Sequence, residues 1–336
     1  MDRARLTQTL AEWGEPPYRV TQAIDAIATG AGAWTEVTPW PKALRARVAA
    51  ELPFWESEVT DRQLSSDGTV KWGLRAHDGA AYEAVLIAHE QGRRTLCVSS
   101  QAGCALACRF CATGSLGAGR DLTAAEIVDQ ARLAAREADA QGSRLTNVVF
   151  MGMGEPMQNL DAVLSACSEL HAAEGLGISA RRIAISTVGW VPGIARLAAF
   201  DLPVRLAVSL HAADDATRSE LMPINARWPL ANLMAACRRY CDQTRRRVMI
   251  EYLLMDGVND QPSDALRLAE LLANGRFHVN LIEYNPTAGP YRSSPADRRI
   301  AFAAALTRAD VGVSIRRSRG ADIAAACGQL AGGASG

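Results

Sequence analysis

Three cysteines lie close together in the segment SQAGCALACRFCATG, at Cys104, Cys108 and Cys111. Their C-x3-C-x2-C spacing gathers three thiolates on one loop, which is one ligand fewer than a closed structural zinc site uses. No histidine or cysteine follows at a suitable spacing, since the next histidine is His171. An iron–sulfur cubane on three thiolates has one iron open to a substrate. The array therefore favours an open [4Fe–4S] site over a zinc knuckle, and Phe110 would shield it.

Composition and charge narrow the class of protein. A chain of 336 residues, 49% hydrophobic and 21% charged, is long enough for a substantial core. No apolar run reaches the ~20 residues of a membrane span, and the polar start MDRARLTQTLAEWGEPPYR does not resemble a signal peptide. We therefore expect a cytoplasmic protein with no membrane partner, whose eight cysteines do not form a disulfide framework. Because the formal net charge is zero, contacts with phosphate must come from local arginine clusters.

Three regions differ in pattern. Residues 1–55 predict short helices, with apolar residues at helical spacing such as Leu6 and Leu10. Residues 56–93 contain two Asp-Gly pairs, in SSDGT and AHDGAA, between alternating apolar residues, which predicts β-hairpins. In residues 94–336, strand-like runs alternate with helical runs, which indicates a parallel sheet that is either doubly wound or closed into a barrel.

Polar residues gather where these strand-like runs end. They occur in TLCVSS, MGMGEP, ISTVG, SLH and YNPT. Since barrel enzymes carry their chemistry at the carboxyl ends of the strands, this pattern favours the barrel. The cysteine array directly follows TLCVSS and would lie on the loop after the first barrel strand.

Several motifs occur together in a fixed order. They are TLCVSSQAGCALACRFCATG, NVVFMGMGEP, ISTVGWVPGI, LAVSLHAADD, LMPIN, IEYLLMDGVND, VNLIEYNPT and RGADIAAACGQLAG. In these motifs, over about residues 75–331, the chain resembles the RlmN/Cfr family of radical S-adenosylmethionine (SAM) RNA (adenine) methyltransferases.

The resemblance implies an α/β fold with three parts. A partial (β/α)6 radical-SAM barrel would occupy residues 94–336, a short β-extension residues 56–93, and a small helical accessory domain that grips RNA residues 1–55. It also implies two cofactors. A [4Fe–4S] cluster would bind the three cysteines of the array, and the amino and carboxylate groups of SAM would occupy its open iron.

The resemblance also assigns residues to SAM. Gly154 and Glu155 of GMGEP would meet its amino group, because glycine lets the backbone approach and a carboxylate pairs with ammonium. The remaining contacts, to ribose, carboxylate or adenine, would come from Ser186, Ser209, Leu210, His211 and Asn285.

Three further residues are implied to act in catalysis. Cys327, in AACGQL, would receive a methyl group, and its methylene would then add to an electron-poor adenine carbon. Glu83, in YEAVLI, would remove the proton from that carbon. Cys97 would attack the Cys327 sulfur and release the product, leaving a transient disulfide.

The other cysteines and the arginines are interpreted separately. Cys167, Cys237 and Cys241 have apolar neighbours at helical spacing, which predicts core packing. Arginines close to the proposed chemistry are candidates for RNA contact: Arg120, Arg316, Arg317 and Arg319.

Three functions stay open at this point. The first is methylation of C2 of adenosine in 23S rRNA, with tRNA as a further substrate, as in RlmN. The second is methylation of C8 by the same residues, as in Cfr. The third is a non-catalytic metal-bearing RNA-binding module. For the enzymes we expect a monomer and an external electron donor such as a flavodoxin-type reductant.

Overall fold

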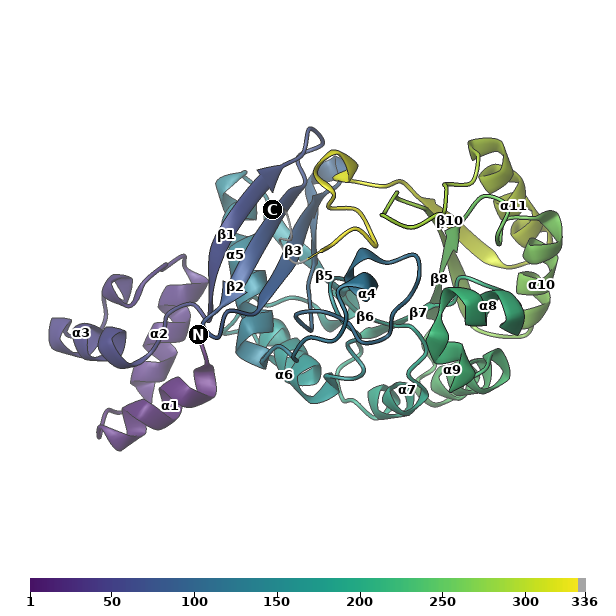
Figure 1. The fold of residues 1–336 in the computed structure, drawn as a ribbon. Coiled ribbons are helices and arrows are strands. Elements are labelled where there is room, and N and C mark those ends of the chain that lie inside the picture. The colour runs from purple at the N-terminus through teal and green to yellow at the C-terminus, as the bar shows by residue number, and fades with distance from the viewer. Residues whose placement is uncertain (332–336) are drawn as a thin grey trace.

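The computed structural model describes residues 1–331 and contains one ten-stranded sheet. Its strands follow one another in chain order, so each strand pairs with its sequence neighbours (Figure 1). They are β1 (Ser57–Leu64), β2 (Val70–Ala76), β3 (Ala81–Ala88), β4 (Arg93–Cys97), β5 (Arg144–Phe150), β6 (Ile183–Thr187), β7 (Arg205–Ser209), β8 (Val248–Leu254), β9 (Phe277–Glu283) and β10 (Gly312–Arg316).

The first four strands form an antiparallel meander, and β4 to β10 are parallel. Both Asp-Gly pairs form the predicted hairpin turns, in which Gly68 and Gly79 have φ of 82° and 88°. These angles favour glycine because other residues clash there. The meander continues the barrel sheet directly, because β3 pairs with β4. Seven strands are therefore parallel, one more than a (β/α)6 unit has.

Helices cover the outside of the parallel strands and form the N-terminal region (Figure 1). They are α1 (Arg3–Glu12), α2 (Tyr18–Ala28), α3 (Lys42–Glu51), α4 (Ala112–Ser115), α5 (Ala124–Ala140), α6 (Leu160–His171), α7 (Val191–Ala198), α8 (Asp215–Leu221), α9 (Leu230–Thr244), α10 (Pro262–Leu272) and α11 (Ala296–Arg308). No helix of the described residues is long and apolar enough to cross a membrane.

The N-terminal helices α1–α3 bury a core of their own. Leu6, Leu10 and Trp40 are at most 2% exposed, and the Trp34 and Trp40 rings stack with centroids 5.7 Å apart. The separate core of the barrel region includes Cys167, Cys237 and Cys241, as their helical spacing predicts.

After β10 the chain returns across the mouth of the open sheet to the first hairpin (yellow in Figure 1). Asp322 of this returning segment accepts hydrogen bonds from Ser65 Oγ (2.6 Å) and from the Ser66 N–H (3.0 Å). Asp67 accepts the Gly320 N–H at 3.0 Å. The turn between β1 and β2 thus holds the C-terminal segment over the carboxyl ends of the barrel strands.

Candidate active site

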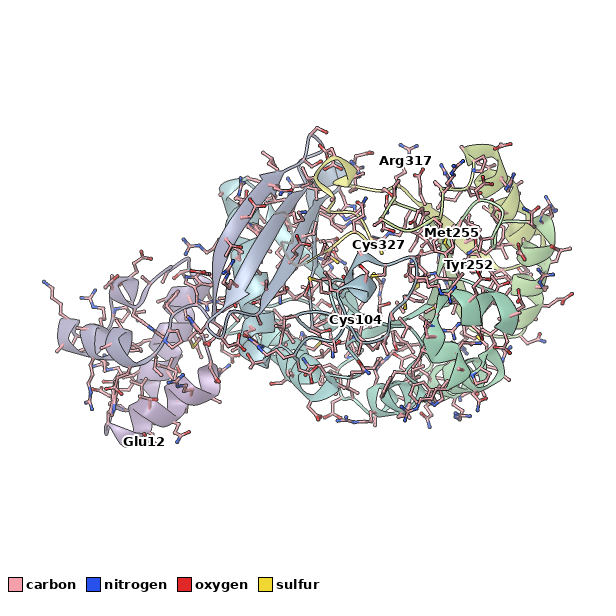
Figure 2. The ribbon with its side chains drawn as sticks, viewed as in Figure 1. Glu12, Cys104, Tyr252, Met255, Arg317 and Cys327 are labelled. Carbon is pink, nitrogen blue, oxygen red and sulfur yellow. The ribbon has the colours of Figure 1, made fainter. Side chains whose placement is uncertain are left out.

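Cys104, Cys108 and Cys111 line one cavity of about 120 Å³ at the carboxyl ends of the parallel strands. The array lies on the loop between β4 and α4, as predicted, and Cys104 and Cys327 are both near the centre of the molecule in Figure 2. Cys327 of the returning segment lines the same cavity.

Close backbone contacts shape the cysteine loop. The Cys104 N–H donates to the Gly117 carbonyl at 2.8 Å, and the Cys111 N–H donates to the Cys108 carbonyl at 3.1 Å. A Cβ atom on Gly114 would lie 2.9 Å from the Cys108 carbonyl oxygen, so this position requires glycine. Phe110 meets the His211 ring edge-on at 4.8 Å and closes one side of the cavity.

The arrangement of the thiols fits a cluster. No three cysteine, histidine or carboxylate side chains of residues 1–331 converge closely enough to hold a single metal ion. A cubane places each thiolate on a different iron, so its ligands must surround a space. The three thiols line one cavity, which agrees with that requirement.

Gly154 and Glu155, on the loop after β5, line the same cavity as the cysteines. Gly154 has φ of 96°, and a Cβ atom there would lie 2.5 Å from Gln101, so a side chain is excluded. The Glu155 carboxylate accepts the N–H groups of Val188 (2.9 Å) and Met157 (3.0 Å). Burial nevertheless raises its pKa to about 7.

The other predicted SAM residues are divided among three locations. Ser186, Ser209 and His211 line the cavity of the cysteines. Leu210 is fully buried behind it, where its N–H donates to the Glu251 carbonyl at 3.0 Å. Asn285 lines a neighbouring cavity and donates to the Cys327 carbonyl at 3.2 Å.

His211 is held as a neutral imidazole. Its Nδ1 accepts the Leu253 N–H at 3.0 Å, which leaves the proton on Nε2. Burial lowers the pKa of His211 to about 3.

A neighbouring cavity of about 270 Å³ is lined by both Cys97 and Cys327. Cys97 ends β4, and burial raises the pKa of its thiol to about 12. Desolvation by the surrounding protein raises the pKa of the Cys327 thiol to about 11. The charge of Arg316, in the same cavity, lowers the pKa of the Cys97 thiol and of the Cys327 thiol. All eight cysteines are free thiols, so the structure does not support the implied disulfide.

Glu83 lies on β3, outside the residues that line these two cavities. Its Oε1 is 3.6 Å from Lys71 Nζ, and both side chains are almost completely buried. Its Oε2 accepts the N–H of Ala331 at 2.8 Å. The returning segment therefore covers Glu83.

Two other elements hold the returning segment around Cys327. The Ala112 N–H, at the start of α4, donates to the Gly328 carbonyl at 2.8 Å, and Thr113 Oγ1 donates to the Leu330 carbonyl at 2.7 Å. The segment thus packs directly on the cysteine loop.

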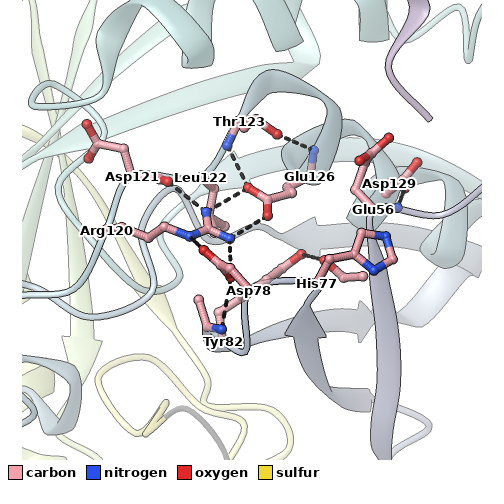
Figure 3. A network of polar contacts seen from close by, with 12 residues as sticks. Glu56, His77, Asp78, Tyr82, Arg120, Asp121, Leu122, Thr123, Glu126 and Asp129 are labelled. Atoms are coloured by element: carbon pink, nitrogen blue, oxygen red, sulfur yellow. Dashed lines mark hydrogen bonds and ion pairs between the residues drawn. The ribbon is translucent and has the colours of Figure 1, made fainter. Parts of the chain in front are cut away.

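Arg120 is not a free cation. Its guanidinium donates two hydrogen bonds to the Asp78 carboxylate and two to the Glu126 carboxylate (Figure 3). The two bonds to Glu126 are 2.7 and 2.9 Å long. Glu126 also caps α5 through Thr123. The prediction that Arg120 contacts RNA overlooked these carboxylates, which join the β2–β3 turn to α5. Arg316, Arg317 and Arg319 line the cavity of Cys97.

A family model described as the radical SAM superfamily matches residues 98–269. The chain is 46% identical to a probable dual-specificity RNA methyltransferase RlmN of Chloroflexus aurantiacus, over 98% of this chain and 91% of that protein. It is 45% identical to a dual-specificity RNA methyltransferase RlmN of Syntrophobacter fumaroxidans, over 96% and 95%. The crystal structure of a radical SAM methyltransferase from Sphaerobacter thermophilus superposes with a TM-score of 0.95, at 46% identity, over 98% of this chain and 97% of that one.

The chain belongs to the RlmN family of radical SAM proteins. The cofactors of this family are a [4Fe–4S] cluster and SAM, and the three-thiol cavity agrees with both. The predicted radical SAM α/β fold is confirmed.

One residue beside the cofactor cavity of this RlmN-family protein, Arg218, was not predicted from the sequence. Arg218 is fully buried, and its guanidinium donates to the carbonyls of Val188 (2.6 Å) and Leu210 (3.2 Å) and to Asn225 Oδ1 (2.7 Å). It therefore braces the loops after β6 and β7, which border the cofactor cavity. Its place in the sequence, seven residues after His211, gave no sign of this role.

Proposed function

We propose that this chain methylates C2 of an adenosine in 23S rRNA, with tRNA as a second substrate, in the cytoplasm. The relatives named as RNA methyltransferases support the class of reaction. The single observation that carries the chemistry is that Cys327 lines both the cavity of the three cysteines and the cavity of Cys97. One sulfur can thus serve both cofactor and RNA.

The cofactors, with an external electron donor of the flavodoxin type, supply the methyl group and the radical that activates it. The chain's own residues would do the rest. Cys104, Cys108 and Cys111 hold the cluster, and SAM is bound by the residues of the cofactor cavity. The Cys327 sulfur accepts the methyl group, whose carbon then bonds C2 of adenine.

Two other residues complete the turnover. Glu83 takes the proton that C2 loses. The Cys97 thiolate attacks the Cys327 sulfur. A sulfur–sulfur bond forms as the bond from this sulfur to the methylene carbon breaks, and the carbon keeps the electron pair and takes up a proton, so that the methylated RNA is released. A dithiol reductant then returns Cys97 and Cys327 to the free thiols of the resting protein. Because the Ala331 N–H occupies Glu83 Oε2, the returning segment must leave Glu83 before adenine can approach.

Electrostatics support an RNA entrance at the Cys97 cavity. Arg93, Arg316, Arg317 and Arg319 line it together with His89. Burial, and then the charges of Arg93, Arg316 and Arg319, lower the pKa of His89 to about 4, so His89 stays neutral. Guanidinium groups fork onto phosphate and stack on bases, which suits a splayed RNA strand.

The proposal is tested with anaerobically reconstituted protein, SAM, a reductant and a 23S rRNA fragment or tRNA. Mass spectrometry of the digested RNA should find 2-methyladenosine, and the Cys327→Ser variant should form none. Finding 8-methyladenosine would establish the Cfr-type alternative instead. RNA that binds but stays unmodified under these conditions would favour the non-catalytic module.

A further inference from the structure

Glu251 is a buried carboxylate that no step above uses. It lies in the middle of β8, is 3% exposed, and lines the cavity of the three cysteines. Its Oε1 accepts a hydrogen bond of 3.0 Å from Asn280 Nδ2. Its Oε2 is buried and has no hydrogen-bond donor among residues 1–331.

A row of polar side chains fixes the orientation of Glu251. In the sheet, Glu251 of β8 is in register with Asn280 of β9, which is in register with Ser314 of β10. Ser314 Oγ donates to Asn280 Oδ1 at 2.6 Å and contacts His278 Nε2 at 3.0 Å. Because the side-chain carbonyl of Asn280 accepts the hydrogen bond from Ser314, its amide nitrogen must face Glu251. The carboxylate is thus oriented before any ligand arrives.

The unused oxygen has an energetic cost. A buried acceptor without a donor costs about 1–3 kcal/mol, and more when it is charged. Glu251 forms no ion pair with the described residues. Burial raises its pKa, and the charge of Arg316 lowers it. A donor supplied by a ligand in the adjoining cavity would remove this cost.

We infer that Glu251 accepts a hydrogen bond from a ribose hydroxyl of SAM. As the resemblance to the family implies, the methionine end of SAM would occupy the open iron at the cysteine loop. Glu251 belongs to the sheet and not to that loop: it is in register with Ser209 of β7 and lines the cavity together with the apolar Leu253 and Ile282. We assign the adenosyl part to this wall of the cavity, because its ribose hydroxyls are neutral donors that a carboxylate oxygen without a partner can accept. This assignment rests on the cofactor and not on the proposed RNA chemistry.

The test is calorimetric binding to anaerobic, cluster-loaded protein, with no turnover. The ligands are SAM, S-adenosylhomocysteine, 5′-methylthioadenosine and the 2′,3′-dideoxy form of 5′-methylthioadenosine. Glu251→Ala should weaken binding of the first three by about 10- to 100-fold, the range for a lost hydrogen bond to a charged group. The dideoxy ligand should bind the native protein equally weakly and be insensitive to the substitution.

A matched control is Glu283→Ala, which removes a carboxylate of the neighbouring β9 that pairs with Arg299 and lies outside the lining of both cavities. It should leave all four affinities unchanged. If Glu251→Ala weakened the binding of SAM alone, the carboxylate would interact with the sulfonium charge. That result would overturn the hydroxyl assignment. If Glu251→Ala left all affinities unchanged, the hydrogen-bond partner of Oε2 would be water, and the hydroxyl assignment would again be overturned. Iron content and melting temperature show whether each variant folds. If Glu251→Ala does not fold, Glu251→Gln replaces it, because glutamine keeps an oxygen that accepts the hydrogen bond from Asn280.

Discussion

Glu83 and Ala331 are 248 positions apart in the chain, and the Ala331 N–H donates a hydrogen bond of 2.8 Å to Glu83 Oε2. The other carboxylate oxygen faces Lys71, one of only two lysines in the protein. The proposed base is therefore shared between a buried ion pair and the segment that carries the reactive Cys327. Its accessibility depends on how firmly that segment is held.

Lys71→Met should destabilise the protein by about 3–5 kcal/mol, because removing one partner of a buried ion pair leaves the other charge without compensation. Urea unfolding measures the difference. The double variant Lys71→Met/Glu83→Leu should recover most of the loss, since it removes both charges. A double variant that is as unstable as the single one would show that Lys71 acts through packing alone.

Cys108→Ala should abolish cluster assembly. Native protein reconstituted without oxygen should hold about four irons per chain and absorb as a [4Fe–4S] protein, and the variant should hold almost none. Cys241→Ala is the matched control, because Cys241 is a buried core thiol of α9 and should leave the iron content unchanged. Stoichiometric zinc without iron in the native protein would contradict the cluster assignment.

Cys97→Ala should accumulate a covalent protein–RNA adduct during turnover, because the thiol that resolves the link is absent. A denaturing gel with labelled RNA detects the adduct, and Cys167→Ala, a fully buried thiol of α6, should form none. Normal multiple turnover by the Cys97 variant would remove this residue from the mechanism.

Arg317→Gln should weaken RNA binding, and Arg120→Gln should not. Arg317 is exposed and lines the cavity of Cys97, whereas Arg120 is paired with Asp78 and Glu126. Each lost phosphate contact should lower the slope of log affinity against log salt by about 0.7–0.9. Equal slopes for native protein and the Arg317 variant would exclude a phosphate contact at this position.

Stability in mild acid should depend on His211. Its pKa is about 3 in the folded protein against 6.5 for the free side chain, so below 6.5 only the unfolded state binds the proton. The folded state should then lose about 1.4 kcal/mol per pH unit as the pH falls toward 3. His211→Asn removes the titrating ring, keeps an acceptor for the Leu253 N–H and tolerates the φ of 58° at this position. Unfolding free energies of cluster-free protein should therefore change less with pH in this variant.

Local patterns predicted much of the fold and of the cofactor site. Alternating apolar runs identified the strands, and the two Asp-Gly pairs identified the hairpins, because these signals depend on neighbouring residues alone. The cysteine array was recognisable because cluster ligation restricts residue type, whereas the SAM contacts, including Gly154, were implied only by the resemblance to the family. The continuity of the β-extension with the barrel sheet was not predicted, because it depends on pairing between β3 and β4.

Other features depend on contacts between distant parts of the chain and left no local sign. Arg120 resembles an exposed cation until the β2–β3 turn brings Asp78 to it. Glu251 acquires its orientation from the register of three strands, and Glu83 is covered by Ala331. A single sequence shows residue types and spacing, but not which remote carboxylate, amide or backbone group faces each side chain.

Strand order in the sheet equals strand order in the chain, and this has a consequence for biosynthesis. Each new strand can pair with the strand that precedes it in the chain, so the sheet can grow as the chain leaves the ribosome. No strand depends on a pairing partner that is synthesised much later. The segment with Cys327 follows β10 and docks on the first hairpin only after all ten strands are available. The thiol proposed to form a covalent link to RNA would thus reach its place last, when the rest of the site is complete.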